Sequence, residues 1–407
     1  MKSRIAVIGL GYIGLPTATI LAKNGQSVVG VDVSAPIVEA VSAGRLPFVE
    51  PDLADALADV VADGSLIATS EMPEAEVYIL AVPTPFLADK SADMAYVESA
   101  TRSIAAKLRG GELLILESTS PPGSTEQMGA WIADARPDLD LSTIDLAHCP
   151  ERVLPGQIMA ELVTNDRVVG GITPQAAERA ADVYRTFCKG EILITDARTA
   201  EMAKLTENAF RDVNIAFANE LSLICERLGV DVWELIELTN HHPRVNVLQP
   251  GPGVGGHCIA VDPWFIVAAA PEESKLISMA RQVNDGKPEH VIHQVIDSVA
   301  GIANPRIATL GLAFKKNVDD LRGSPAIQIT GDLARRLPDA TVVAVEPHVD
   351  ALPESLADLG VTLEMVDDAL KGADAVVLLV DHDVFADLDR ELLGTATVHD
   401  TRGLWKS

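Results

Sequence analysis

Short, unbroken runs of apolar residues recur in the first part of this 407-residue chain, and stretches with helical periodicity lie between them. Such runs, rich in Val, Ile and Leu, are typical of strands that are buried on both faces of a sheet. The expected strands are residues 5–8, 27–31, 77–82 and 113–117, and the expected helices include 16–23 and 94–108. Strands that alternate with helices predict a parallel sheet covered on both faces, in a unit that ends at about residue 195.

A long helix is predicted after this unit. No Gly or Pro occurs from Thr199 to Leu228, and Gly229 stands where a helix C-cap belongs. At 1.5 Å per residue this helix is about 45 Å long. We expect it to connect two domains and to supply the face of a homodimer. Helical sequence continues to about residue 295, interrupted by a loop rich in Pro and Gly from His241 to Pro263.

The strand pattern then starts again, at residues 306–311, 341–345 and 375–380. The predicted fold class is therefore α/β, with three parts. A Rossmann-type parallel-sheet domain is expected over residues 1–195, a central long-helix region over 196–295, and a smaller Rossmann-like domain over 296–407. No internal sequence repeat is evident.

The net charge and the cysteine content limit the kinds of partner that this protein is expected to bind. The chain has 32 Lys and Arg against 59 Asp and Glu, a formal net charge of -27, which repels nucleic acid and anionic membranes. No run reaches the roughly 18 apolar residues that a membrane span needs. The four cysteines are too sparse for a disulfide framework and lack paired metal spacing. These features predict a soluble cytoplasmic protein with reduced thiols, no metal, and no nucleic-acid or membrane partner.

A dinucleotide fingerprint, Gly9-Leu10-Gly11-Tyr12-Ile13-Gly14, follows the first expected strand and opens the first expected helix. In this motif Gly9 permits a tight turn, Gly11 lets the backbone approach a pyrophosphate, and Gly14 packs the helix against the strand. Asp32 ends the next strand, where it can accept hydrogen bonds from ribose hydroxyls and repel a 2′-phosphate. The prediction is NAD rather than NADP; the alternative is a tight turn without a cofactor.

Hydroxyl groups follow two further strands of the expected sheet. Thr84 comes after Val82-Pro83, and Ser118-Thr119 comes after the strand at 113–117. Ligands of such sheets bind beyond the carboxyl ends of the strands, so these hydroxyls are candidates for contact with the dinucleotide or the substrate. A turn-forming role without a ligand is equally compatible with each of them.

Cys258 follows the glycine-rich stretch Gly253-Val254-Gly255-Gly256-His257. Glycines allow backbone conformations that other residues avoid, which suits a thiol presented as a nucleophile. Cysteine is more often a small buried apolar residue, and that description suits Cys188 and Cys225. Cys149 is the competing nucleophile, but it lacks the glycines.

Two groups of basic and polar residues could gather on a ligand. Lys204, Asn208 and Arg211 have helical spacing that places them on one face of the long helix, with apolar neighbours that predict partial burial. A solvated charged face is the alternative. Isolated basic residues in glycine-bearing loops predict phosphate binding, against the alternative of surface salt bridges. These residues are His242, Arg244, Lys315 and Arg322.

Several long motifs in the same order resemble the UDP-glucose/GDP-mannose dehydrogenase family over essentially the whole chain. They are Gly9–Pro16, Val82–Pro85, Glu117–Gly123, Cys149–Gly156, Lys204–Asn208, the Cys258 loop and Phe314-Lys315. The resemblance implies an N-terminal NAD domain, a central helix that mediates dimerisation, and a C-terminal domain that binds UDP.

The resemblance also implies roles for individual residues. Cys258 would form a thiohemiacetal and then a thioester with C6 of the sugar, and Lys204 with Asn208 would assist proton transfer and stabilise the oxyanion. Asp262 would order a water or hold Lys204, and Glu151 would activate the hydrolytic water. The implied sugar and diphosphate contacts are Arg152, Val153, Lys204, Asn208, Arg211, His242, Arg244, Gly255 and Lys315. The implied NAD contacts are the fingerprint residues, Asp32, Thr84, Thr119 and Arg322.

Three stretches point to one branch of the family. They are Glu151-Arg152-Val153, Asn240 to Arg244, and Asp262-Pro263-Trp264. This branch oxidises UDP-N-acetyl-D-mannosamine to its uronate, for the supply of surface polysaccharide precursors. A 6-dehydrogenase of UDP-N-acetylglucosamine or UDP-glucose remains an alternative. So do a two-electron hydroxyacid dehydrogenase, which needs no thiol, and a nucleotide-sugar sensor without activity.

Overall fold

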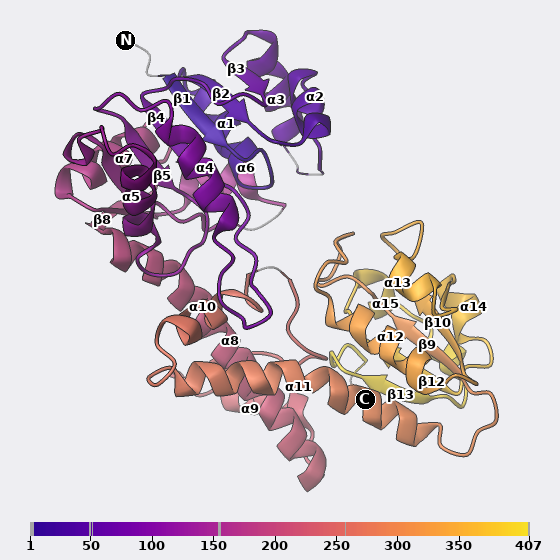
Figure 1. Cartoon of the computed structure of the whole chain (residues 1–407). Helices are drawn as coiled ribbons and strands as arrows, with labels where there is room; N and C mark the ends of the chain where they lie inside the picture. Colours follow the sequence, from indigo (N-terminus) through magenta and orange to yellow (C-terminus); the bar gives the residue numbers. More distant parts are fainter. Residues whose placement is uncertain (1–3, 49, 51, 154–155, 257, 406–407) are drawn as a thin grey trace. The chain divides into compact units, whose positions relative to one another are not determined.

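The chain folds into two compact units, unit 1 (Met1–Glu207) and unit 2 (Asn208–Ser407) (Figure 1). The computed structural model describes residues 4–48, 50, 52–153, 156–256 and 258–405. The boundary between the units falls inside the long helix α8 (Ala197–Leu228). Among the described residues, no helix is both long and apolar enough to cross a membrane.

Unit 1 contains an eight-stranded sheet with the order β3-β2-β1-β4-β5-β6-β7-β8. Within the described residues its neighbouring strands pair in parallel, except for β6 and β7, which are antiparallel. The strands are β1 (Arg4–Ile8), β2 (Ser27–Val31), β3 (Leu66–Thr69), β4 (Val77–Leu80), β5 (Leu113–Leu116), β6 (Asp145–His148), β7 (Arg167–Gly171) and β8 (Ile192–Asp196).

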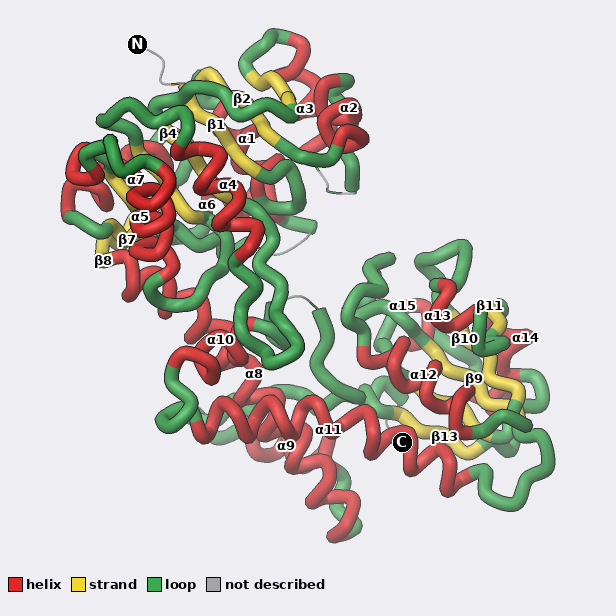
Figure 2. Tube along the Cα trace, viewed as in Figure 1, coloured by secondary structure: helices red, strands yellow, loops and turns green. Residues whose placement is uncertain are grey.

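Helices cover both faces of this sheet (Figure 2). Successive residues of a strand point to opposite faces, so Ile5 and Val7 enter one core while Ala6 and Ile8 enter the other. The first core is closed by α1 (Gly14–Lys23), α2 (Ala35–Ser42), α3 (Leu53–Ala62), α6 (Ile158–Thr164) and α7 (Pro174–Arg185). The second core is closed by α4 (Ala95–Ala105) and α5 (Ser124–Ala135), beside the short 3-10 helix η1 (Leu141–Thr143).

Unit 2 begins with helices and ends in a second sheet. The end of α8 packs with α9 (Val232–Asn240), α10 (Asp262–Ala269) and α11 (Lys275–Ser298), and α11 crosses α8 beside α9 (Figure 1). Buried hydrogen bonds fix this crossing, because Arg281 and Asn284 of α11 both donate to Asp212 of α8.

The second sheet has five strands in the order β11-β10-β9-β12-β13, with parallel pairing throughout the described part. They are β9 (Arg306–Leu310), β10 (Thr341–Val345), β11 (Thr362–Leu363), β12 (Ala375–Leu378) and β13 (Thr397–Asp400). One face packs on α11, α12 (Pro325–Arg336) and α13 (Glu354–Ala357), and the other on α14 (Val366–Leu370), α15 (Asp383–Ala386) and Trp405. The 3-10 helix η2 (Arg390–Leu393) precedes β13.

The predicted α/β fold is confirmed, with each of the seven predicted strands present to within two residues at either end. The order β11-β10-β9-β12-β13 repeats the order β3-β2-β1-β4-β5 of unit 1, which agrees with the prediction of a second, Rossmann-like domain. The two sheets therefore share a topology that is not evident as a sequence repeat. In each, the order reverses between two central strands, β1 and β4 or β9 and β12, which is where such sheets bind ligands.

Candidate active site

The fingerprint turn lies at the carboxyl end of β1, and its geometry requires glycine at two places. Gly9 has a φ of +92°, and a Cβ there would lie 2.5 Å from the carbonyl oxygen of Ala81. A Cβ at Gly14 would lie 1.9 Å from the oxygen of Gly9. By contrast, a Cβ at Gly11 would meet nothing within 4 Å. The turn is therefore closed by contact with the loop after β4 and leaves Gly11 facing open space, as the approach of a pyrophosphate requires.

Asp32 lies beside this turn, as predicted. One carboxylate oxygen accepts the N–H of Leu10 and the other accepts the N–H of Ser34, each at 2.8 Å. An ionised carboxylate offers about four lone-pair sites, so this half-buried group keeps capacity for ribose hydroxyls. On the other side of the turn, the ring of Tyr12 stacks on Phe48, with centroids 4.2 Å apart.

The equivalent turn of unit 2 starts in the same way. Gly311, at the end of β9, has a φ of +88° and donates its N–H to Val345 of β10 at 2.8 Å, just as Gly9 donates to Val31 of β2 at 2.8 Å. A Cβ at Gly311 would lie 2.4 Å from the Cβ of Val380, in the loop after β12. In both sheets, therefore, the loops that follow the two central strands approach each other closely at the place where the strand order reverses.

The second turn does not fit a dinucleotide, however. Ala313 and Lys316 stand where the first turn has Gly11 and Gly14, and Ala313 is buried. Glu346, which corresponds to Asp32, is also buried, and it accepts four hydrogen bonds, from three backbone N–H groups and from His382. These residues leave no open glycine and no spare carboxylate, so the features that suit NAD are those of unit 1.

The predicted hydroxyl residues are brought together beside the first turn. Thr84 donates its hydroxyl to the carbonyl oxygen of Thr119 at 2.6 Å, which joins the loops after β4 and β5. Ser118 donates in turn to the carbonyl oxygen of Val82 at 2.7 Å. Both threonines are half-buried at the carboxyl edge of the sheet.

Lys204 lies in α8 between two carboxylates, Glu201 and Glu207. Spacings of three residues place these side chains on one face of a helix. Glu201 is buried and accepts the backbone N–H groups of Gly123 and Thr125, at 2.5 and 2.7 Å, at the start of α5. This contact holds the α8 turn that carries Lys204 against the segment that follows Thr119.

Arg152 makes the second contact that holds this part of α8 in place. Its guanidinium pairs with Glu207 at 2.6 Å and donates to the carbonyl oxygen of Asp166 at 3.0 Å. The residue predicted to bind the sugar diphosphate therefore joins the loop after β6 to α8 within unit 1. Val153, next along this loop, is half-buried and packs against the first core.

Glu151 belongs to a buried polar cluster at the carboxyl ends of β5 and β6. Arg167 of β7 donates to its carboxylate at 3.0 Å. A second carboxyl group, Glu117, lies in the same cluster and accepts hydrogen bonds from Thr17 of α1 and Tyr184 of α7, both at 3.2 Å. Burial, together with the negative charge of Glu151, raises the pKa of Glu117 to about 8.

The competing nucleophile lies inside this cluster. Cys149 is fully buried, and burial raises the pKa of its thiol to about 12. Because the thiolate is the nucleophilic form, Cys149 is not available for attack on a substrate near neutral pH. Cys258 is exposed, so the structure supports its ranking as the nucleophile over Cys149.

Replacing Glu117 with glutamine should change stability in a pH-dependent way. With a pKa of about 8 in the folded chain against an ordinary value of 4.5, Glu117 binds a proton that the unfolded chain releases between these values. The free energy of unfolding of the wild type therefore falls as pH rises through this window. Because glutamine has no such titration, Glu117→Gln should gain roughly 3 to 4 kcal/mol relative to wild type between about pH 5 and about pH 8. Denaturant unfolding of both proteins measures this gain, and a difference that does not change with pH would contradict it.

The start of the cysteine loop is held in unit 2 by the crossing of α8 and α11. Gly251 donates its N–H to Asn219 of α8 at 2.9 Å, and Asn219 donates to Asn284 of α11 at 2.8 Å. Both asparagines are buried. Because buried amides of this kind are costly to leave unpaired, the network fixes where the loop begins.

The glycines of the loop pack against the segment that precedes α12. A Cβ at Gly255 would lie 2.6 Å from Pro325 and 2.8 Å from the carbonyl oxygen of Gly323. Gly256 has a φ of +86° and donates its N–H to the same carbonyl at 3.3 Å. The glycine-rich sequence is therefore required by close backbone packing. His257 lies outside the described residues.

Cys258, Asp262 and Asn208 are brought together as predicted for a site. The carbonyl oxygen of Cys258 accepts the N–H of Asp262 at 2.8 Å, at the start of α10. Asn208 of α8 donates to the Asp262 carboxylate at 2.5 Å, and Asp262 is only 3% exposed. The backbone of the exposed Cys258 is thus hydrogen-bonded to Asp262, whose carboxylate is held by the Asn208 amide.

The residues predicted to bind phosphate are all exposed, but their contacts differ. Lys315 lines a small pocket at the carboxyl ends of β9 and β12, together with Gly253, Pro325 and Arg402. Arg322, in contrast, donates to both carboxylate oxygens of Asp320 at 2.8 Å. The remaining members of the set are exposed on α8 or in the turn after α9: Arg211, His242 and Arg244.

Among the described residues, Glu346, His348 and His382 bring metal-ligand atoms within 4.8 Å of one another. Nδ1 of His382 accepts the N–H of Asn317 at 2.9 Å, which places the proton on Nε2, 3.1 Å from Glu346. A neutral imidazole then has no lone pair left for a metal. The cluster instead fixes the loop that carries Lys315.

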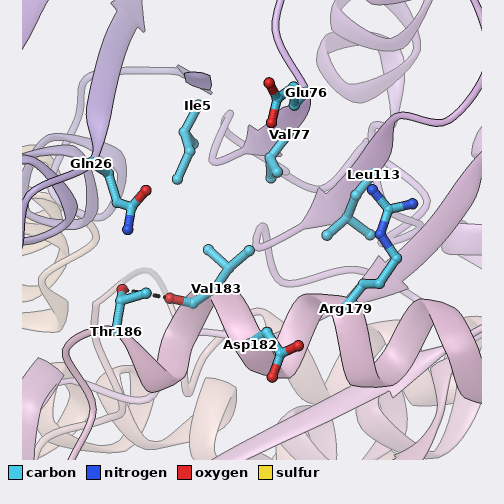
Figure 3. Close-up of a pocket in the computed structure, with 9 residues that line it drawn as sticks. All are labelled: Ile5, Gln26, Glu76, Val77, Leu113, Arg179, Asp182, Val183 and Thr186. Carbon is cyan, nitrogen blue, oxygen red and sulfur yellow. Dashed lines mark hydrogen bonds between the residues drawn. The ribbon is translucent and has the colours of Figure 1, made fainter. Parts of the chain in front are cut away.

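A second pocket lies at the opposite edge of the unit 1 sheet (Figure 3). Ile5, Val77 and Leu113 line it from the amino ends of β1, β4 and β5, and Arg179 and Asp182 line it from α7. Dinucleotides bind at the carboxyl ends of such strands, so this pocket is separate from the candidate active site.

Three buried residues of the site region have no role in the sequence-based prediction: Glu117, Arg167 and Glu201. A signal existed for Glu117, because a charged residue directly after the buried run 113–116 needs a specific partner. Arg167 and Glu201 lie in ordinary polar surroundings in the sequence, and only the fold shows that they are buried.

Comparison with known proteins agrees with this arrangement. Models of the UDP-glucose/GDP-mannose dehydrogenase family match residues 3–188 as the NAD binding domain, 198–286 as the central domain and 308–407 as the UDP binding domain. The chain is 54% identical to an NDP-N-acetyl-D-galactosaminuronic acid dehydrogenase of Ralstonia nicotianae, over 99% of this chain and 96% of the relative. It is 52% identical to the UDP-N-acetyl-D-mannosamine dehydrogenase of Escherichia coli K12, over 99% of each chain.

Solved structures show the same relationship. A UDP-D-ManNAc dehydrogenase of Pyrococcus horikoshii superposes with a TM-score of 0.91 at 38% identity, covering 99% of this chain and 96% of that one. The UDP-N-acetyl-mannosamine dehydrogenase of Staphylococcus aureus gives a TM-score of 0.88 at 41% identity, covering 100% and 96%. The chain therefore belongs to the UDP-glucose/GDP-mannose dehydrogenase family and is an NAD-dependent nucleotide-sugar dehydrogenase.

Proposed function

We propose that the protein oxidises the C6 hydroxyl of UDP-N-acetyl-D-mannosamine to a carboxylate, in two two-electron steps that pass through a thioester on Cys258. The observation that carries the four-electron chemistry is the exposed cysteine in its closely packed glycine loop, whose backbone is hydrogen-bonded to Asp262, the partner of Asn208. The choice of sugar is supported by relatives that bear this activity in their names. The product would serve as a precursor of a surface polysaccharide.

NAD, when bound, supplies the hydride acceptor for both oxidations. The fingerprint turn fits it, because Gly11 opens to free space and Asp32 keeps acceptor capacity. We assign its contacts to the turn residues Gly9, Gly11, Tyr12, Ile13 and Gly14, and to Asp32, Thr84, Thr119 and Arg322. Arg322 would have to leave Asp320 in order to take part.

Cys258 solves a specific problem of the second oxidation. A free aldehyde has no tetrahedral carbon that bears an oxygen and a transferable hydride. Addition of the Cys258 thiolate to the aldehyde carbon forms a C–S bond and makes that centre. Its oxidation leaves a thioester. A water molecule then adds to the carbonyl carbon, the C–S bond breaks, and the electron pair returns to sulfur.

The remaining catalytic roles are assigned to residues with suitable donors or acceptors. Lys204 would move a proton to or from the C6 oxygen, and Asn208 would donate to the oxyanion, each contributing on the order of 3 kcal/mol. Asp262 would order the Asn208 amide and a water, and Glu151 would take the proton of the hydrolytic water. We assign the sugar and diphosphate to Arg152, Val153, Arg211, His242, Arg244, Gly255 and Lys315, in addition to Lys204 and Asn208.

We also propose that the chain works as three functional parts, with NAD held by residues 1–195, the central helices and cysteine loop in 196–295, and UDP bound by 296–407. The matches of the three family models support this division.

We propose further that the protein is a homodimer through α8. Large apolar side chains form a stripe on its C-terminal part, at spacings of seven, seven and four residues, and are 45 to 71% exposed: Phe210, Phe217, Ile224 and Leu228. Apolar residues at this spacing make the seam between paired helices, and a second copy of the same helix offers a matching stripe.

A charge in this stripe should dissociate the dimer. Phe217→Glu would bury an unpaired carboxylate at the seam, so the variant is expected to elute as a monomer in size-exclusion chromatography with light scattering. Leu238→Glu is the matched control, because Leu238 is 63% exposed on α9, outside the stripe. Dimers of equal stability in both variants would show that the stripe is not the interface.

The choice of sugar is tested by comparing substrates under identical conditions. NADH formation is measured with the UDP derivatives of N-acetylmannosamine, N-acetylgalactosamine, N-acetylglucosamine and glucose. We expect the highest kcat/KM with UDP-N-acetyl-D-mannosamine. The near-equal identity to an NDP-N-acetyl-D-galactosaminuronic acid dehydrogenase makes the galacto sugar the second candidate, and a higher kcat/KM for that substrate would replace the proposed one.

A further inference from the structure

Arg167, the first residue of β7, places a guanidinium inside unit 1. Its side chain is 4% exposed, and it lies over the rings of Tyr184 and Phe187, at 4.8 and 5.3 Å from their centroids. A cation buried this deeply is tolerated only with a charged or hydrogen-bonding partner. The partner is Glu151, which is 7% exposed and accepts from Arg167 at 3.0 Å.

Both oxygens of the Glu151 carboxylate are fixed by this arrangement. One accepts from Arg167, and the other accepts the backbone N–H of Arg152 at 2.7 Å. Each oxygen keeps further acceptor capacity. The carboxylate is therefore held in one orientation, at the carboxyl end of β6, while it can still accept a proton.

The cluster contains one cation and two carboxyl groups, so its charges are unequal unless one carboxyl group is protonated. Arg167 donates its hydrogen bond to the carboxyl group of Glu151, whereas Glu117 accepts from the hydroxyl groups of Thr17 and Tyr184. Cys149 and Tyr184 also face the cluster, and burial raises the pKa of both. The guanidinium of Arg167 is thus paired with the carboxyl group of Glu151.

We propose that Arg167 is a positioning residue for the hydrolysis of the thioester, because it holds the Glu151 carboxylate in the orientation from which it takes a proton from water. This proposal rests on the proposed function, in which Glu151 is the base. In the step concerned, Glu151 removes one proton from water while the water oxygen bonds to the thioester carbon. The C–S bond breaks, Cys258 leaves with the electron pair, and Glu151 releases its proton to solvent.

The test separates oxidation from hydrolysis in Arg167→Met, which keeps much of the side-chain volume but removes the charge. After rapid mixing with NAD and UDP-N-acetyl-D-mannosamine, we expect a burst of two NADH per active chain, followed by steady turnover at least about tenfold slower than in wild type. Intact-mass analysis during turnover should find the sugar acyl group on Cys258.

Arg167→Lys is the conservative variant, and it guards against loss of folding in Arg167→Met. It retains a cation that can pair with Glu151, so it should restore part of the steady rate. Slower turnover in either variant without a burst and without an acyl adduct would overturn the proposal and leave Arg167 a structural residue. Failure of the proposed function would look different, because the wild type itself would then not form two NADH per sugar.

Discussion

Replacing Cys258 with serine is expected to abolish the four-electron oxidation while NAD binding stays unchanged. A serine hydroxyl is a much weaker nucleophile than a thiolate, so the aldehyde would not be captured and the second oxidation would have no substrate. The loss of kcat should be on the order of a thousandfold or more. Because Cys258 is exposed, the substitution should cost little stability. Steady-state NADH formation and a calorimetric NAD titration measure the two effects.

The control for this prediction is Cys188→Ser, which changes a half-buried cysteine of unit 1 in the same chemical way. It should retain wild-type turnover. Wild-type turnover in Cys258→Ser would eliminate the thioester route and return the two-electron hydroxyacid dehydrogenase to consideration.

Replacing Gly14 with alanine should disrupt the NAD domain itself. A Cβ there would lie 1.9 Å from the oxygen of Gly9 and 3.1 Å from the Cβ of Ala81, so the turn and the loop after β4 must separate. Without this clash, alanine would favour the helix by about 1 kcal/mol over glycine. A loss of unfolding free energy in Gly14→Ala would therefore point to the clash rather than to helix propensity. We expect a net loss of about 3 kcal/mol or more of unfolding free energy, together with loss of NAD binding.

Gly11→Ala is the matched control, because a Cβ at Gly11 meets nothing within 4 Å. This variant should keep the thermal unfolding temperature of the wild type and lose NAD affinity alone, since the added methyl group stands where the pyrophosphate approaches. Equal stability of Gly14→Ala and Gly11→Ala would show that the turn is looser than its geometry indicates.

The predictable part of the fold is the part that is buried on both faces. Strands such as Val77–Leu80 and Val342–Val345 are unbroken apolar runs because helices cover both sides of them. The edge strand Ile192–Asp196 was not predicted, since Leu193 and Ile194 are exposed and the segment has no clear pattern. The second domain was predicted to be Rossmann-like from its strand pattern, although Ala313 and Lys316 stand where the first turn has two glycines.

The residues of the candidate site likewise fall into some that the sequence predicts and some that it does not. The fingerprint turn was predictable because its chemistry lies within six consecutive residues. The pairing of Asn208 with Asp262 joins residues far apart in the sequence and was not predicted, because the family resemblance implied only that both residues belong to the site. Arg152 shows the limit of assigning roles by residue type, since its guanidinium pairs with Glu207 inside unit 1. Arg167 has no local signal, because burial of a single arginine depends on the tertiary fold.

The most direct test of the central claim is the amount of NADH formed per molecule of UDP-N-acetyl-D-mannosamine consumed. Absorbance of NADH and chromatography of the sugar nucleotides give both quantities in one reaction with the purified protein. A four-electron oxidation through Cys258 predicts two NADH per sugar and a uronate product. One NADH per sugar, with an aldehyde or keto product, would contradict it.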